Sequence, residues 1–308
     1  MTTEFELALR GAGGEPVDLI RTINSHGFAE LSPMRLSDDQ RTLEVTLPLR
    51  RSRPRRVRIA PGRRGHARVS VLGPPPSPRG AERVLAGVRH VLRLDADLSP
   101  FYVLAAADPD FGWVTTGAGR MLRSPTVFED VVKTICTTNC SWGLTTKMVN
   151  ALVSGLGEPP VGVRDDPRAN AFPSPESMAA EPVDFYREVV RAGYRAPHFV
   201  ALSRAVVSGE LDLESLGRAS REELPDDEVE RTLLTIPGVG PYAAAHIMMT
   251  IGRDSRLILD SWSRPKYARL LGKRSVADAA ILRRFRPFGE HAGLAFWLFV
   301  TRDWVAPG

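Results

Sequence analysis

The stretch 234-LTIPGVGPYAAAHIMMTIGRDSRLILDSW-262 contains a turn signal and, further on, a lone acid. Gly238 and Gly240 are separated by one residue, and Pro241 begins an alanine-rich run. Glycine tolerates positive φ and close backbone approach, and proline is favoured at the first position of a helix. The pattern therefore predicts a helix, a tight hairpin and a second helix, followed by Asp260 at the end of the apolar run RLIL.

A helix that starts directly after such a hairpin presents free N–H groups and the positive end of its dipole, which together suit an anion. The chain has a net charge of +5 and a pI of about 9.5. This charge favours an anionic partner, and the hairpin would hold one nucleic-acid phosphate without reading bases. An ordinary connection between helices is the alternative. For Asp260 the alternative is the N-cap of a helix, a role compatible with chemistry.

Composition sets broad limits on the class of protein. The 308 residues suggest two or three lobes of a soluble globular chain, and no apolar run is long enough to span a membrane. Two cysteines, Cys136 and Cys140, are too few for a zinc or iron–sulfur site and fit a reducing compartment. We therefore expect a cytoplasmic protein without disulfide bonds. We also expect it to be a monomer and to require no cofactor.

The first 80 residues alternate apolar and polar positions as strands do. FELAL, TLEVTLPL, RVRIA and ARVSVL predict an antiparallel sheet. The segment Arg50–Arg68 has nine arginines and no acid, and indicates a basic hairpin or loop that either touches phosphates or is solvated. Beyond it the apolar spacing is helical. Ser124 as N-cap and Pro125 as first residue predict the start of one helix.

The expected fold class is α+β and mostly α. A small antiparallel β lobe, residues 1–88, precedes a two-part helical body. One part comprises residues 89–123 with 232–308 and carries the hairpin and Asp260; the other is a bundle of residues 124–231.

The hairpin and its acid resemble the helix-hairpin-helix DNA glycosylase superfamily, and the likeness extends from about residue 95 to 304. VFEDVVKTICTTNCSWGLTTKMVNALVSGLG and AGYRAPHFVALSRAV are similar to the 8-oxoguanine branch, and the FELAL start to bacterial 3-methyladenine glycosylases. The resemblance implies base-excision repair of double-stranded DNA. A damaged base is flipped out, and Asp260 stabilises the sugar cation by about 4 kcal/mol at 4 Å and a dielectric of 20.

The resemblance also implies roles for individual residues. Asn139 would fill the hole left by the flipped base, Tyr194 would be the wedge, and Arg195 would contact the orphaned base. The base pocket would be formed by His246, Phe296, Val300 and Trp297. Phosphate would be held by Gly238, Gly240, Trp262, Arg264 and Lys266. Carbonyls binding K⁺ or Na⁺ would be those of Leu234, Ile236 and Val239.

Each of these side chains has a structural alternative. Tyr194 and His246 could be core residues, Asn139 a helix C-cap, and Arg264 and Lys266 part of a solvated helix face.

Tyr242, the other catalytic-site candidate, departs from the oxoguanine pattern. It stands where that branch carries a lysine that forms a Schiff base, which a phenol cannot do. We expect a single-function enzyme that leaves an intact abasic site, with Lys266 as an outside candidate for lyase chemistry. The polar side chain that forms hydrogen bonds with the edge of a guanine in the oxoguanine branch is also missing. The lesion therefore stays open between an alkylated purine, an oxidised purine and an unusual base.

The alternative function is a non-catalytic protein that binds damaged DNA on a glycosylase fold. A pure binder gains little from a carboxylate placed near phosphates, so Asp260 favours the enzyme.

Overall fold

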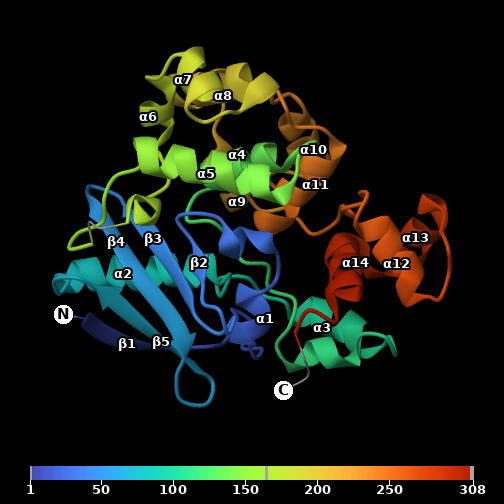
Figure 1. Ribbon diagram of the computed structural model, residues 1–308. Helices are drawn as coiled ribbons and strands as arrows, with labels where there is room; N and C mark the ends of the chain where they lie inside the picture. The colour runs from blue at the N-terminus through green and yellow to red at the C-terminus, as the bar shows by residue number, and fades with distance from the viewer. Residues whose placement is uncertain (1, 164–165, 306–308) are drawn as a thin grey trace.

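The computed structural model describes residues 2–163 and 166–305 (Figure 1). Residue 1 of the predicted β lobe, residues 164–165 of the predicted bundle and residues 306–308 of the other helical part lie outside the described residues. The N-terminal part is a five-stranded antiparallel sheet in the order β1-β5-β4-β3-β2. Its strands are β1 (Thr2–Ala8), β2 (Arg35–Leu36), β3 (Leu43–Leu49), β4 (Ser52–Pro61) and β5 (His66–Leu72). The four predicted strands are confirmed; β2 has two residues, too few for a visible alternation.

The arginine-rich segment 50–68 belongs to the sheet. It forms the turn after β3, all of β4 and the start of β5. Arg56 is buried, and its guanidinium pairs with Glu44 at 3.2 Å, while Arg58 pairs with the same carboxylate at 2.7 Å. The segment is therefore a β hairpin and not an irregular loop, although most of its arginines are exposed to solvent. Acids outside the segment pair with Arg53, Arg56, Arg58 and Arg63, and its contact with phosphates stays a prediction.

The rest of the described chain is mainly helical, as expected for the fold class. The longer helices are α2 (Pro78–Val91), α3 (Ser99–Ala106), α4 (Val127–Thr137), α5 (Trp142–Leu156), α8 (Ala196–Ser208), α10 (Asp226–Leu234), α11 (Pro241–Thr250), α12 (Ser263–Leu270), α13 (Asp278–Phe285) and α14 (Ala292–Thr301). The shorter ones are α1 (Leu19–Ile23), α6 (Pro175–Ala179), α7 (Val183–Glu188) and α9 (Leu213–Arg218). No helix in residues 2–163 and 166–305 has both the length and the apolar character to cross a membrane.

The start of α4 differs from the prediction. Thr126, and not Ser124, is the N-cap, and its hydroxyl accepts the N–H of Glu129. The Ser124 N–H instead donates to the Asp130 carboxylate at 3.1 Å. Both residue types cap helices well, so the sequence alone does not choose between them.

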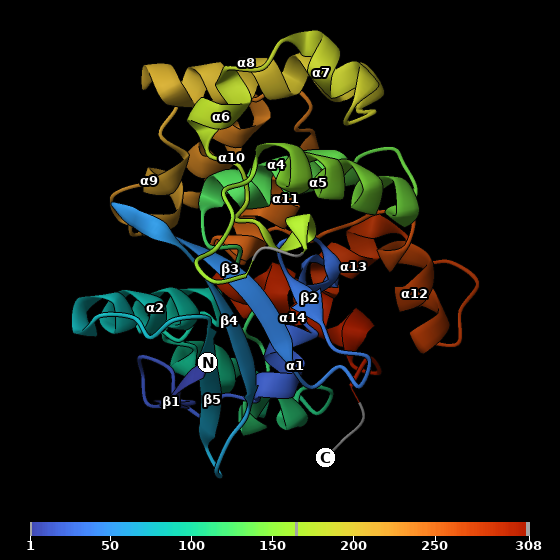
Figure 2. The ribbon, with the colours of Figure 1, turned by 60° about the vertical axis from the view of Figure 1, so that its left-hand side comes forward.

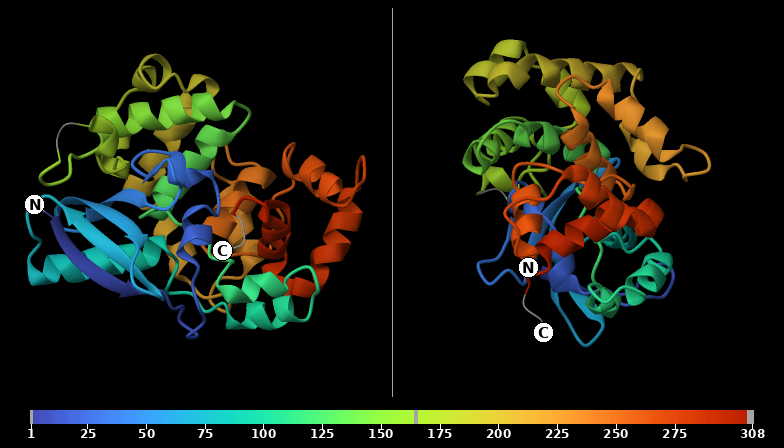
Figure 3. Two further views of the ribbon diagram at one scale, coloured as in Figure 1. Left: turned by 60° about the horizontal axis from the view of Figure 1, so that its bottom comes forward. Right: turned by 90° about the vertical axis from the view of Figure 1, so that its right-hand side faces the viewer.

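Three buried apolar clusters organise the molecule. One joins the sheet to α2, with members from Leu7 to Leu94 and Leu122. The second joins residues 98–121, including α3, to the C-terminal helices α12–α14 (Figures 1 and 3). The third fills the helical lobe of α4–α11, which lies above the sheet in Figure 2, and also contains Phe28 and Leu31. The predicted domain boundaries stay predictions.

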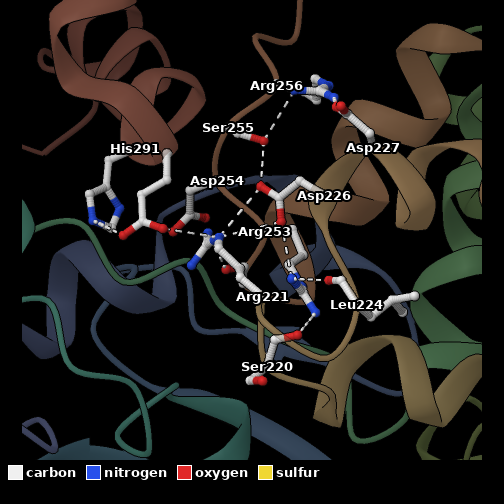
Figure 4. Close-up of polar contacts among 12 residues, drawn as sticks. Ser220, Arg221, Leu224, Asp226, Asp227, Arg253, Asp254, Ser255, Arg256 and His291 are labelled. Atoms are coloured by element: carbon white, nitrogen blue, oxygen red, sulfur yellow. Dashed lines mark hydrogen bonds and ion pairs between the residues drawn. The ribbon is translucent and has the colours of Figure 1, made fainter.

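A buried polar network fixes the chain that runs from α11 to α12 (Figure 4). The Arg253 side chain donates to the carbonyls of Ala219, Ser220 and Leu224 at 2.6–3.2 Å and to the Asp226 carboxylate at 3.1 Å. These acceptors lie between α9 and the start of α10. Arg253 therefore ties the segment after α11 to the beginning of the hairpin's first helix.

The neighbouring residue, Asp254, extends the network to two other elements. Its carboxylate forms a bidentate pair with Arg93 at 2.6 and 3.1 Å, and both side chains are buried. Its carbonyl accepts the N–H groups of Gly293 and Leu294 at the start of α14. The segment that leads to Asp260 is thus anchored on three sides.

Replacing Arg253 with leucine should lower the free energy of unfolding by about 3 kcal/mol, because it removes four hydrogen bonds and leaves buried acceptors unpaired. Denaturant titration monitored by circular dichroism measures the change. The exposed Arg204 of α8 is the matched control, and Arg204→Leu should change the value by less than about 0.5 kcal/mol. Equal effects of the two substitutions would show that the network is dispensable.

Candidate active site and nucleic-acid interface

A cavity of about 1120 Å³ lies where the turn between α10 and α11 meets the chain before α12. The sequence-predicted residues that line it are Asn139, Tyr194, Gly238, Val239, Gly240, Tyr242, His246, Asp260, Trp262 and Trp297. Residues far apart in the chain thus meet around one hollow. Among the described residues that line the cavity, Asp260 is the one acid, and none is a lysine or an arginine.

Asp260 is half-buried just before α12. Its Oδ1 accepts the N–H groups of Trp262 at 2.9 Å and Ser263 at 2.6 Å, and the Asp260 N–H donates to the Ser263 hydroxyl at 2.9 Å. The aspartate therefore pairs with two free N–H groups at the start of α12, whose N-cap residue is Trp262, and these two bonds fix the orientation of the carboxylate. Oδ2 accepts no hydrogen bond within the described part of the chain, which leaves it available to the cavity.

The turn between α10 and α11 brings two glycine amides to the cavity. The Val239 N–H donates to the Ile236 carbonyl at 3.0 Å, and Gly238 has a φ of +89°. α11 begins at Pro241. The amides of Gly238 and Gly240 donate to no other group of residues 2–163 and 166–305. They are free donors next to a helix N-terminus, the arrangement that suits a phosphate.

Asn139 and Tyr194 form one rim of the cavity. Asn139 follows α4 with a φ of +47°, and its Nδ2 donates to the Tyr194 hydroxyl at 3.3 Å. The Tyr194 side chain is 52% exposed, and its ring lies edge-on to His198, with 5.9 Å between centroids. Tyr194 is thus an exposed residue and not a core tyrosine. The plug and wedge roles stay predictions.

Arg195 is placed differently from the expectation. It is only 3% exposed; its Nε donates to the Ile135 carbonyl at 3.1 Å, and its Nη2 to the Thr138 carbonyl. Both carbonyls lie at the C-terminal end of α4, where the negative end of the helix dipole attracts a guanidinium. Its charge also lies 4.5 Å from the centre of the Tyr194 ring. In this structure Arg195 therefore supports the rim, and its contact with an orphaned base stays a prediction.

His246 lies on the inner wall. Its ring packs against Phe28 with 4.9 Å between centroids, against His26 at 5.8 Å and against Tyr242 at 6.1 Å. Burial lowers the pKa of His246 to about 3 and that of His26 to about 4. Both imidazoles are therefore neutral at pH 7, and the wall is aromatic and uncharged.

Phe296 and Val300 do not line the cavity. Both are completely buried in the C-terminal cluster, where the Phe296 ring packs against Phe285 and Tyr267. The two residues are four apart, so they share one face of α14, and that face points into the core. Trp297 lies on the neighbouring face and does line the cavity, with its Nε1 donating to the Ser25 carbonyl at 2.8 Å.

The predicted phosphate ligands beyond the hairpin divide into two groups. Trp262 lines the cavity and packs against Trp297 and Trp304, with 5.8 and 5.5 Å between centroids. Arg264 instead forms a bidentate pair with Asp278 at 2.8 and 2.9 Å, and Lys266 pairs with Asp303. Neither cation lines the cavity in this structure.

Sequence reasoning missed the lining residues His26, Gly27, Phe28, Trp142 and Trp304. A Cβ on Gly27 would come within 2.7 Å of the Trp142 ring, so this glycine permits a close approach of two distant segments. The HGF tripeptide is the signal that could have pointed here, although nothing in it shows which segment it meets.

No family model matches this chain. Over 177 residues it is 24% identical to a DNA-3-methyladenine glycosylase of Bacillus subtilis (strain 168), and this region is 54% of each protein. The chain therefore matches about half the length of this curated relative.

Two solved structures are similar over almost the whole chain. The 3-methyladenine DNA-glycosylase from Archaeoglobus fulgidus is 20% identical, with a TM-score of 0.71, over 98% of this chain and 100% of that one. The 8-oxoguanine glycosylase/lyase of Clostridium acetobutylicum, in complex with double-stranded DNA, is 19% identical, with a TM-score of 0.67, over 93% and 92%. The chain therefore shares its overall fold with these solved DNA glycosylases, in agreement with the resemblance drawn from the sequence.

Gly238→Ala should destabilise the turn, whereas Gly240→Ala should not. At Gly238 the positive φ costs about 1–2 kcal/mol for alanine, and its Cβ would come within 2.6 Å of His198 Nδ1. Gly240 has a φ of −98°, and no atom lies within 4 Å of the place that an alanine Cβ would take. Thermal unfolding of the two single variants measures the difference. An unchanged Tm for Gly238→Ala would contradict it.

Proposed function

We propose that this chain is a DNA N-glycosylase that flips a damaged base out of double-stranded DNA and hydrolyses its N-glycosidic bond. One observation carries the proposal: the free Oδ2 of Asp260 shares a cavity with the unpaired amides of Gly238 and Gly240 and with an aromatic wall. The amides hold the backbone phosphate, so the sugar arrives beside the carboxylate. The wall receives the base.

The chemistry requires a fixed negative charge next to a sugar that becomes positive. Asp260 supplies it, held in place by the Trp262 and Ser263 amides. A carboxylate oxygen so placed can also orient or deprotonate the attacking water. The free Oδ2 can stabilise the sugar cation and act on the water without any change in the backbone. An abasic site and a free base are the products.

We further propose that the reaction stops at the abasic site. Schiff-base chemistry needs an amine, and none of the lining residues in the described chain is a lysine. Tyr242 occupies the wall of the cavity, and burial raises the pKa of its phenol, so that it stays neutral. Lys266, the outside candidate, is engaged with Asp303.

The lesion is a damaged or unusual base, with alkylated and oxidised purines both admitted. Neutral imidazoles and aromatic rings form a wall suited to stacking, and the tryptophans at positions 142, 262, 297 and 304 enlarge it. The enzyme acts on DNA as a monomer.

A monovalent cation fits the turn as part of the same proposal. The carbonyls of Leu234, Ile236 and Val239 would hold it, since K⁺ and Na⁺ take oxygen ligands. One of the three, Ile236, already accepts the Val239 N–H at 3.0 Å. The cation would add positive charge to the phosphate grip, and the chain's own amides would still donate to the phosphate.

Asp260→Asn should reduce base release by about 10³-fold while DNA binding persists, because about 4 kcal/mol of charge stabilisation is lost. Asparagine keeps the oxygen that accepts the N–H groups at the start of α12, so the fold is retained. Single-turnover release from duplexes with 7-methylguanine, 1,N6-ethenoadenine, hypoxanthine or 8-oxoguanine, followed by mass spectrometry, measures the loss. The exposed Asp38→Asn is the control.

The same panel separates the enzyme from a non-catalytic DNA-binding protein. If wild type binds the lesion duplexes in a salt-dependent manner but releases no base from any of them, the binding role replaces the enzyme.

Borohydride should trap no covalent DNA adduct with the wild-type protein, since no lysine of the described residues lines the cavity. Tyr242→Lys places an amine on that wall and should produce an adduct visible as a shifted band after denaturing electrophoresis. A strong adduct with the wild type, lost in Lys266→Ala, would instead assign lyase chemistry to that lysine.

A further inference from the structure

His246 is a buried polar side chain whose hydrogen bonds are missing. It is 8% exposed, and neither Nδ1 nor Nε2 has a partner within the described residues. Its neighbours on α11, residues 243–249, are otherwise alanine, isoleucine and methionine. A buried polar group left unpaired costs about 1–3 kcal/mol, so its persistence in an apolar helix calls for a partner supplied from outside the protein.

Three polar side chains between residues 137 and 145 on the same wall already have partners. The Thr145 hydroxyl donates to the Cys136 carbonyl at 2.9 Å, and the Thr137 hydroxyl donates to the Thr134 carbonyl at 2.7 Å. The Cys140 thiol also lies 3.0 Å from the Cys136 carbonyl. Among these inner side chains, His246 is the one with unused hydrogen-bonding capacity.

His26, the neighbouring histidine on the wall, differs from His246 in that both of its ring nitrogens have hydrogen-bond partners. His26 Nε2 donates to the Leu122 carbonyl at 2.7 Å, and its Nδ1 accepts the Phe28 N–H at 3.3 Å, so its tautomer is fixed. No group of the described chain fixes the tautomer of His246. A neutral imidazole of this kind can offer an N–H to a carbonyl or ring nitrogen, or a lone pair to an amino group.

We propose that His246 is a specificity-determining residue, which forms a hydrogen bond with the extruded base through whichever ring nitrogen matches the base's edge. This inference rests on the proposed glycosylase function. Stacking on the aromatic wall accepts many flat bases, whereas a hydrogen bond at this depth rejects a base that cannot make it. Because the tautomer is free, bases derived from adenine and from guanine can both satisfy the ring.

The test compares DNA with and without a base to read. In the Asp260→Asn background, affinities are measured for duplexes with hypoxanthine, with 7-methylguanine, and with a tetrahydrofuran abasic analogue. Adding His246→Phe should weaken binding to the better-bound base duplex by about 10- to 100-fold and binding to the abasic duplex by less than about twofold. His246→Gln, which keeps a donor and an acceptor, should recover most of the loss.

Three outcomes decide the matter. Equal loss on the base and abasic duplexes, or no loss on either, overturns the inference; if the phenylalanine variant does not fold, His246→Met takes its place. If the wild type releases a base but His246→Phe weakens binding to base-containing and abasic duplexes equally, the glycosylase proposal holds and the role of His246 in specificity is wrong. If the wild type releases no base from any lesion but His246→Phe weakens binding only to base-containing duplexes, the catalytic proposal is wrong and the hydrogen bond from His246 to the base is retained.

Discussion

The site depends on a fixed separation between the turn that would hold a phosphate and the carboxylate of Asp260. Arg253 ties the intervening chain to the start of α10, and the Arg93–Asp254 pair ties it to the end of α2. Buried ion pairs add little net stability, but breaking one is costly, so they strongly disfavour other placements of the chain. Their contribution here is position: the acid cannot drift relative to the turn without leaving buried charges unpaired.

The chain's positive charge lies largely outside the cavity. Arg264, Arg256 and Arg58 all pair with acids in the surrounding structure, and the histidines on the cavity wall are neutral. No lysine or arginine therefore lines the cavity beside Asp260 in the described residues. Under the proposed function this matters, because a neighbouring cation would offset the negative charge that stabilises a developing sugar cation. These arginines stabilise the surrounding structure through ion pairs, and the negative charge of Asp260 is not offset by a cation in the cavity lining.

Local patterns made much of this predictable. Alternation marked the four longer strands, and the glycines and proline after α10 marked the turn, because φ > 0 and a missing N–H are properties of single residues. Asp260 could be placed because the family resemblance supplies the spacing between such a turn and its aspartate. These features require no knowledge of distant contacts.

The parts that escaped prediction depend on such contacts. Arg195 looks like a surface residue until the end of α4 supplies carbonyls for it. The resemblance put Phe296, Val300 and Trp297 in the base pocket, but the packing of the C-terminal core sets the rotation of α14, so that of the three only Trp297 lines the cavity. Phe28 could not be found at all, because its role arises only where the N-terminal segment meets α11.

Phe28 and Leu31 follow α1, yet they are buried with the helical lobe and not with the sheet. The N-terminal segment is therefore an integral part of the cavity wall and more than an appended module. A protein that kept the helical lobe but began after residue 31 would have an open side where a flat ligand could slide out, and it would need a substitute ring from elsewhere to close it.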